Sequence, residues 1–206
     1  MHTANTPEIL ANPQKLRPRV TQPDGSDVSL PFRFSRQRYE QMVAAGIFQP
    51  EDKVELLNGQ VVPMSPQSAE HANAIRRLTM LLAALVADVA EVSVQLPFAA
   101  TEDSEPEPDL CVVPKGTDAS RHPERAWLMI EVARSSAQKD RTTKAAIYAQ
   151  ANVTDYWIVD VNAKVVEVYR QPRGDHYGAM YTAGLEDRIE IAEFPGRFVA
   201  VADIFR

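Results

Sequence analysis

Three acidic residues of this 206-residue chain lie in segments whose composition is typical of buried β-strands. Glu131 interrupts the apolar run 127–133, Asp109 precedes the apolar run 110–113, and Glu55 lies in the short β-prone run VELLNG. A carboxylate that is buried without a partner costs several kcal/mol or takes up a proton. These three residues are therefore the first candidates for chemistry.

Asp109 and Glu131 could share a bound cation. If their two strands are neighbours, both carboxylates can reach one end of the same sheet. Like charges at that distance repel, so one pKa would rise unless a cation lay between them. A hard divalent ion such as Mg²⁺ prefers oxygen ligands, and binding it would offset the burial of Glu131. The pattern therefore predicts a metal site at this end of the sheet.

A cationic partner for this site follows in the segment SSAQKDRTTKAAIYAQ, residues 135–150. Asp140 and Lys144 are one helical turn apart, and Tyr148 follows one turn later. A lysine that points at an attacking water or a scissile phosphate would activate the water or stabilise charge building on phosphorus. The alternative is a surface ion pair between Asp140 and Lys144 that contributes only a few tenths of a kcal/mol.

Each remaining candidate also has a purely structural interpretation. Glu131 could be held by a buried partner such as an arginine, and Asp109 could cap a turn after Pro108. Glu55 could be one of the exposed glutamates that are common on hairpins. His71, in the first turn of a long predicted helix, could be a hydrogen-bonding residue at the edge of the core.

Capping residues and periodicity predict the elements that position these side chains. Ser35 is a plausible N-cap of a helix that ends near Gly46. Asn58-Gly59 between two β-prone runs predicts a hairpin. A long helix with one apolar face is predicted from Ser68 to Val89.

The rest of the chain alternates strand-like and helical segments. Strands are predicted over 91–98, 108–114 and 126–132, a helix over 138–151, a hairpin from 155–161 and 164–170, and short strands over 176–182, 188–192 and 198–205. Because strands precede and follow two helices, we expect an α/β fold of mixed α+β type, with a central mixed sheet flanked by helices.

Composition places the chain among soluble globular proteins. It is 45% hydrophobic and 24% charged, and no apolar stretch approaches the roughly 20 residues of a membrane span. The single cysteine, Cys111, excludes an internal disulfide and a cysteine zinc cage. The polar N-terminus has no signal-peptide pattern, so a cytoplasmic protein is expected.

Net charge and proline content bear on the binding partners and on the domain boundary. A net charge of −6 argues against a non-specific nucleic-acid coat, but not against an enzyme that gathers carboxylates around a cation and keeps a local basic patch. Residues 1–31 carry five of the 15 prolines and little periodicity, which predicts a flexible N-terminal arm. Residues 32–206 are then expected to form one domain.

Several segments, taken in order, resemble one known family. They are YEQMVAAGIF at 39–48, KVELLNGQVVPMSP at 53–66, SEPEPDLCVV at 104–113, IEVARSS at 130–136 and VADIF at 201–205. This constellation is similar to the Uma2 family, a group of bacterial proteins in the PD-(D/E)XK nuclease superfamily described as "putative restriction endonucleases". The resemblance covers about residues 32–206 and implies a restriction-endonuclease-like fold.

The resemblance also implies roles for individual residues. Asp109 matches the first acid of the superfamily signature and Glu131 the second, but Ala133 stands where the signature lysine is expected. Lys144, on the following helix, is the candidate for a migrated lysine. Glu55 matches a glutamate of the family's hairpin. His71 matches a histidine at the start of the family's long helix, so both join the predicted catalytic set.

Together these observations predict an endonuclease that hydrolyses DNA with Mg²⁺ or Mn²⁺. Asp109, Glu131 and the Val132 carbonyl would hold the metal, Glu55 would complete the acidic cluster, and Lys144 would orient the attacking water. DNA is the expected substrate, and cutting both strands of a duplex would favour a homodimer. The alternative is a catalytically inactive nuclease-fold module that binds nucleic acid or a protein partner. A third reading, an acid/base hydrolase, lacks the clustered aromatics of a sugar site.

Overall fold

The computed structural model describes residues 19–21, 27–29, 31–49, 51–118, 120–133 and 137–206. The predicted flexible arm, residues 1–31, falls largely outside these ranges. Its described part forms strands β1 (Arg19–Thr21) and β2 (Asp27–Ser29), which pair antiparallel. In the described ranges, no helix combines the length and the apolar character that crossing a membrane requires.

The central element is a mixed six-stranded sheet, which confirms the predicted fold class. In spatial order its strands are β10 (His176–Ala183), β9 (Val165–Arg173), β8 (Asp155–Asp160), β7 (Leu128–Ala133), β6 (Leu110–Pro114) and β5 (Ala90–Val94). Neighbouring strands are antiparallel except for β7 and β8, which are parallel. Strand β7, which carries Glu131, is buried along its whole length because it has strands on both sides and helices over both faces.

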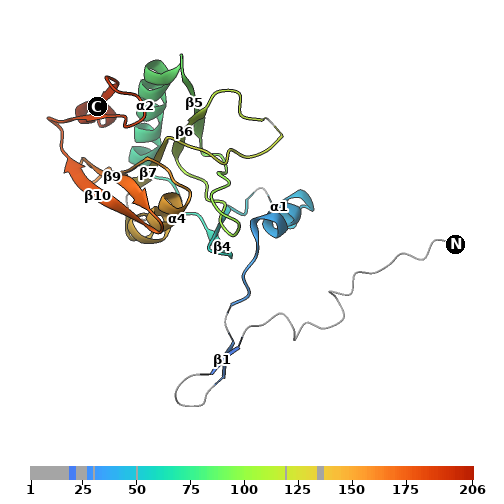
Figure 1. Ribbon diagram of the computed structural model, residues 1–206. Helices are drawn as coiled ribbons and strands as arrows, with labels where there is room; N and C mark the ends of the chain where they lie inside the picture. Colours follow the sequence, from blue (N-terminus) through green and yellow to red (C-terminus); the bar gives the residue numbers. More distant parts are fainter. Residues whose placement is uncertain (1–18, 22–26, 30, 50, 119, 134–136) are drawn as a thin grey trace.

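Helices cover the sheet on both faces (Figure 1). On one face, α2 (Ala69–Val86) buries Ile75, Leu78 and Leu82 against the strands. The C-terminal elements β11 (Arg188–Glu190), β12 (Phe198–Ala200) and α5 (Val201–Ile204) complete this layer. On the other face, α4 (Ala145–Gln150) buries Ile147 and Tyr148.

The predicted N-terminal helix and hairpin are present. Helix α1 (Arg36–Ala44) begins after Ser35, whose hydroxyl accepts a hydrogen bond from the Arg38 N–H. The hairpin is formed by β3 (Val54–Leu57) and β4 (Gln60–Pro63). Asn58 and Gly59 both have positive φ, 48° and 75°, as a type I′ turn requires.

The helix predicted over 138–151 is not a regular α-helix. It consists of α3 (Ala137–Lys139), a π-helical turn η3 (Asp140–Lys144) and α4. The N–H of Ala145 bonds to the carbonyl of Asp140, five residues earlier. π-Helical turns are rare and are frequent at functional sites. This one follows strand β7, which carries Glu131, and it ends at the predicted lysine, Lys144.

The C-terminal strand predicted over 198–205 is shorter than expected. Strand β12 ends at Ala200, where its ladder with β11 stops, and the next four residues form α5. The Val201 N–H donates instead to the Asp187 carbonyl, and Val201 and Ile204 are buried in the α2 layer. One helical turn places both of these apolar side chains on the same side, where they are buried, and this favours a helix over a continued strand.

Candidate active site

The register of the sheet places Asp109 and Glu131 opposite each other. Leu110 on β6 pairs with Ile130 on β7, so the next position outward brings Asp109 across from Glu131. Directly opposed residues of antiparallel strands point to the same face of a sheet. Both side chains line one small pocket with a volume of about 50 Å³, on the face that α4 covers.

Glu131 is buried and hydrogen-bonded to two side chains from the helical segment beyond β7. Its Oε1 accepts a bond from Lys144 Nζ at 2.9 Å and from the Tyr148 hydroxyl at 2.6 Å. Burial raises the pKa of Glu131 to about 8; Lys144 opposes this shift, while Asp109 and Asp140 add to it. The buried partner of Glu131 is therefore a lysine on the next helix, where an arginine was the structural alternative.

Lys144 bridges two carboxylates. Its Nζ lies 2.9 Å from Glu131 Oε1 and 3.0 Å from Glu55 Oε2, and the residue is only 4% exposed. Burial by itself would lower the pKa of Lys144, but Glu131 and Glu55 raise it above its ordinary value. Lys144 is therefore a buried cation and not part of a surface ion pair.

Glu55 is buried on the hairpin and not exposed to solvent. At 1% exposure it accepts from Lys139 Nζ at 2.8 Å through Oε1, and from the Glu107 N–H at 3.3 Å through Oε2. Burial by itself would raise its pKa, but Lys144 and Lys139 lower the pKa of Glu55 below its ordinary value. Glu55 therefore remains ionised beside Lys144.

Asp109 organises the opposite side of the pocket. Its Oδ2 accepts the Val132 N–H at 2.8 Å and lies 2.9 Å from His71 Nε2, and its Oδ1 accepts from Gln95 Nε2 at 3.3 Å. His71 stands in the first turn of α2, with its own N–H bonded to Ser68 Oγ. Its Nδ1 is buried and has no hydrogen-bond partner within the described residues.

The structure thus brings every predicted catalytic residue to one pocket. The predicted residues that line it are Glu55, His71, Asp109, Glu131, Val132 and Lys144. In the part of the chain that the structure describes, Glu55, Asp109 and Glu131 do not form a three-donor group within 4.8 Å of one another. Instead, Lys144 lies between Glu131 and Glu55.

Sequence reasoning missed several residues of this pocket. Lys139 and Glu107 line it, and Gln95 bonds Asp109. Asp140 and Tyr148, which were noted only for their helical spacing from Lys144, also belong to it. The place of Glu107 in the pocket was predictable, because side chains two positions apart in an extended segment point the same way, and Asp109 is two residues after Glu107. Gln95 had no local signal, since its partner Asp109 lies 14 residues away in the sequence.

The model of the Uma2 family, described as "Putative restriction endonuclease", matches residues 36–202. The solved structure of "a putative nuclease belonging to DUF820" from Anabaena variabilis ATCC 29413 is 14% identical, with a TM-score of 0.63, over 84% of this chain and 97% of that one. The type IIG restriction endonuclease BpuSI matches at 14% identity and a TM-score of 0.37, over 55% of this chain and 14% of that one. No curated protein matches the chain.

Proposed function

The chain belongs to the Uma2 family of restriction-endonuclease-like proteins, and from this we propose that it is a metal-dependent endonuclease that hydrolyses phosphodiester bonds in DNA. The observation that carries the proposal is the buried Lys144, which bonds Glu131 and Glu55 in a pocket that Asp109 also lines. A lysine and carboxylates at the end of a central sheet supply both a fixed positive charge and oxygen ligands.

The donor chemistry of the pocket fits a divalent cation. Its lining contains five carboxylates, two lysines and one histidine, so negative charge is in excess. Asp109 and Glu131 would hold the ion, with the Val132 carbonyl as a further oxygen ligand. Mg²⁺ and Mn²⁺ suit such a set. When bound, the ion would polarise a phosphoryl oxygen and neutralise charge in the transition state.

The chain's own residues would position the reacting groups. Because its pKa is raised, Lys144 stays protonated and acts as a hydrogen-bond donor and fixed charge, and not as a base. It can therefore orient the attacking water or stabilise the charge that builds on the phosphoryl oxygens. His71, Gln95 and the Val132 N–H hold Asp109 in place, and Tyr148 does the same for Glu131.

Incubation of the full chain with supercoiled plasmid and with linear duplex DNA tests this function. Cleavage is expected with Mg²⁺ or Mn²⁺ and should stop on addition of EDTA. A two-fold dimer would convert plasmid directly to the linear form, whereas a single acting pocket would produce nicked circles. An RNA duplex of the same sequence shows whether DNA is preferred. Activity that survives both Asp109→Ala and Glu131→Ala would exclude this pocket as the active site.

A second candidate function is a catalytically inactive nuclease-fold module that binds nucleic acid or a protein. It is favoured by one observation: Lys144 already places a positive charge between Glu131 and Glu55. In such a module the lysine would replace the metal as a structural counter-ion. The pocket would then hold the fold together without performing chemistry.

Metal-dependent stability separates the two candidates. If the pocket binds Mg²⁺, the free energy of unfolding should rise by about 2.7 kcal/mol at about 100 times the Kd, since the ion binds only the folded state. Glu131→Gln should remove most of this gain. Urea unfolding with and without Mg²⁺ measures it. An equal gain in the wild type and Glu131→Gln, or none in either, would favour the module.

A further inference from the structure

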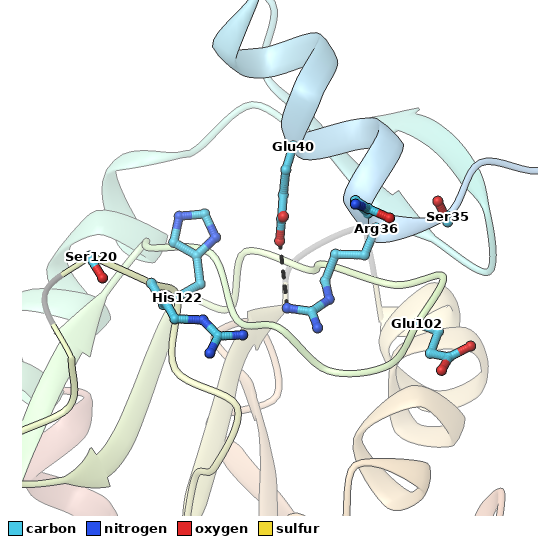
Figure 2. A pocket seen from close by; sticks show the side chains of 8 residues that line it. Ser35, Arg36, Glu40, Glu102, Ser120 and His122 are labelled. Carbon is cyan, nitrogen blue, oxygen red and sulfur yellow. Dashed lines mark ion pairs between the residues drawn. The ribbon is translucent and has the colours of Figure 1, made fainter.

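A second group of metal-binding side chains lies outside the catalytic pocket. It contains Glu40 on α1, Glu105 in the connection between β5 and β6, and His122 in the connection between β6 and β7. One donor atom of each residue lies within 4.8 Å of the others. Figure 2 shows the Glu40 carboxylate reaching from α1 into a cavity of about 740 Å³, beside the His122 imidazole.

The buried carboxylate of Glu105 is the second, independent sign of a ligand. The residue is 3% exposed, and its Oε1 lies 3.2 Å from His122 Nδ1. Its Oε2 is buried and has no hydrogen-bond partner among the described residues. An unpartnered buried carboxylate oxygen is costly, and ions or ordered waters commonly satisfy such atoms.

The backbone of Glu105 is held in place beside the hairpin. Its backbone N–H donates to the Leu56 carbonyl at 2.8 Å, and its carbonyl accepts from the Leu56 N–H at 3.2 Å. These bonds fix the segment against strand β3. Burial raises the pKa of Glu105; His122 opposes the increase and Glu40 adds to it. The site therefore holds a buried acid that meets an imidazole at one oxygen and lies against the Glu40 carboxylate. Two carboxylates this close favour either a shared proton or a bound cation.

The other two donors are accessible to an ion from solvent. The side chains of Glu40 and His122 are 43% and 44% exposed. Both residues line the first cavity and also a second one, of about 500 Å³, which Glu105 lines too. The competing partner of Glu40 is Arg36, at 3.5 Å on the same exposed helix face, an i,i+4 pair of small energetic value.

We propose that Glu40, Glu105 and His122 bind a divalent transition-metal ion, with Zn²⁺ as the favoured ion. One imidazole nitrogen and two carboxylate oxygens suit Zn²⁺ or Mn²⁺, whereas Mg²⁺ and Ca²⁺ prefer all-oxygen sites. The ion would fasten α1 to the two connections that flank β6. Because Glu105 precedes Glu107 and Asp109, it would also steady the segment that enters the catalytic pocket. This site does not depend on the proposed nuclease function.

Zn²⁺ titration of the tag-free, EDTA-stripped full chain by isothermal calorimetry tests the site. The titration uses the double variant Asp109→Asn/Glu131→Gln, called the silenced background, in which the proposed metal ligands of the catalytic pocket are removed. This variant should still bind one Zn²⁺ per chain. His122→Ala and Glu40→Gln should each weaken binding by at least about tenfold, since each removes a ligand. Both residues are half exposed, so both variants should fold. His176→Ala is the matched control. His176 also faces an acid, Asp175, at 3.2 Å, but no third donor from the described part of the chain joins them, so its removal should leave the affinity unchanged.

Two further results decide the proposal. Zn²⁺ should raise the Tm of the silenced background, and this increase should disappear with His122→Ala and persist with His176→Ala. Anomalous scattering from crystals soaked in Zn²⁺ should place a peak between Glu40, Glu105 and His122. The proposal would be overturned if the silenced background bound no Zn²⁺, or if it and its His122→Ala derivative bound Zn²⁺ equally well. An anomalous peak at another position would also overturn it.

Discussion

Asp109→Asn is expected to lower the rate of metal-dependent DNA cleavage by about 10²–10³-fold, while the fold is retained. Asparagine has nearly the same shape as aspartate. The side-chain oxygen of the asparagine can take the place of Asp109 Oδ2, which accepts hydrogen bonds from the Val132 N–H and from His71. The NH₂ group of the asparagine then faces the Gln95 side chain. The Gln95 amide can rotate to accept this new donor. The substitution therefore removes a charge from the pocket while every hydrogen bond remains available.

Cleavage rates measured at saturating DNA over a range of Mg²⁺ concentrations check this result. The variant should need more Mg²⁺ and remain slower at saturation, because both ion binding and charge stabilisation weaken. Glu186→Gln is the matched control, since it removes one negative charge from an exposed position and should leave the rate unchanged. Urea unfolding without metal should show a change within about 1 kcal/mol. A wild-type rate in the folded Asp109→Asn protein would contradict a role for Asp109.

Above about pH 8, where Glu131 is ionised, Lys144→Met should destabilise the metal-free protein by about 3–5 kcal/mol, because it leaves buried carboxylates without their shared cation. Methionine occupies a similar volume, so packing changes little. Glu55 keeps Lys139, whereas Glu131 loses Lys144 and keeps the Tyr148 hydroxyl among its bonds to described residues. Protonation of Glu131 removes the unpaired charge, and burial already raises its pKa to about 8. The loss should therefore be smaller at acidic pH than at alkaline pH.

A double-mutant cycle isolates the contribution of the Lys144–Glu131 pair. Adding Glu131→Gln to Lys144→Met should recover part of the lost stability, because the uncompensated charge is gone. Urea unfolding in EDTA provides the free energies. Lys115→Met is the control: the residue is exposed after β6, and its loss should change stability by no more than about 0.5 kcal/mol. Strictly additive effects of the two substitutions would show that the observed bridge contributes nothing to stability.

Much of the architecture could be predicted from local signals. Ser35 and Ser68 mark helix starts because their hydroxyls satisfy N–H groups of the first turn. Asn58-Gly59 marks the hairpin because both residues tolerate positive φ. The apolar run around Glu131 indicated a buried strand, which is the centrally placed β7. These signals depend only on neighbours in the chain, so the sequence contains them in full.

The partners of the acids were less predictable. On a regular α-helix, Lys139 and Lys144 would point about 140° apart, so nothing suggested that both reach Glu55. The π-helical turn between them changes this direction, and each ammonium lies within 3.0 Å of that carboxylate. The alternative interpretation, a surface ion pair between Asp140 and Lys144, relied on α-helical geometry and on exposure, and neither applies here.

The residue pattern was therefore enough to identify the acidic residues within apolar strands and to predict the mixed sheet that holds them. The partners of those charged side chains depend on how the elements pack together. Strand order and register set Asp109 across from Glu131, and burial of α4 against the sheet directs Lys144 inward. The packing also brings Glu40, Glu105 and His122 together from three separate segments. Contacts of this kind depend on the packing of distant segments, and no local propensity encodes them.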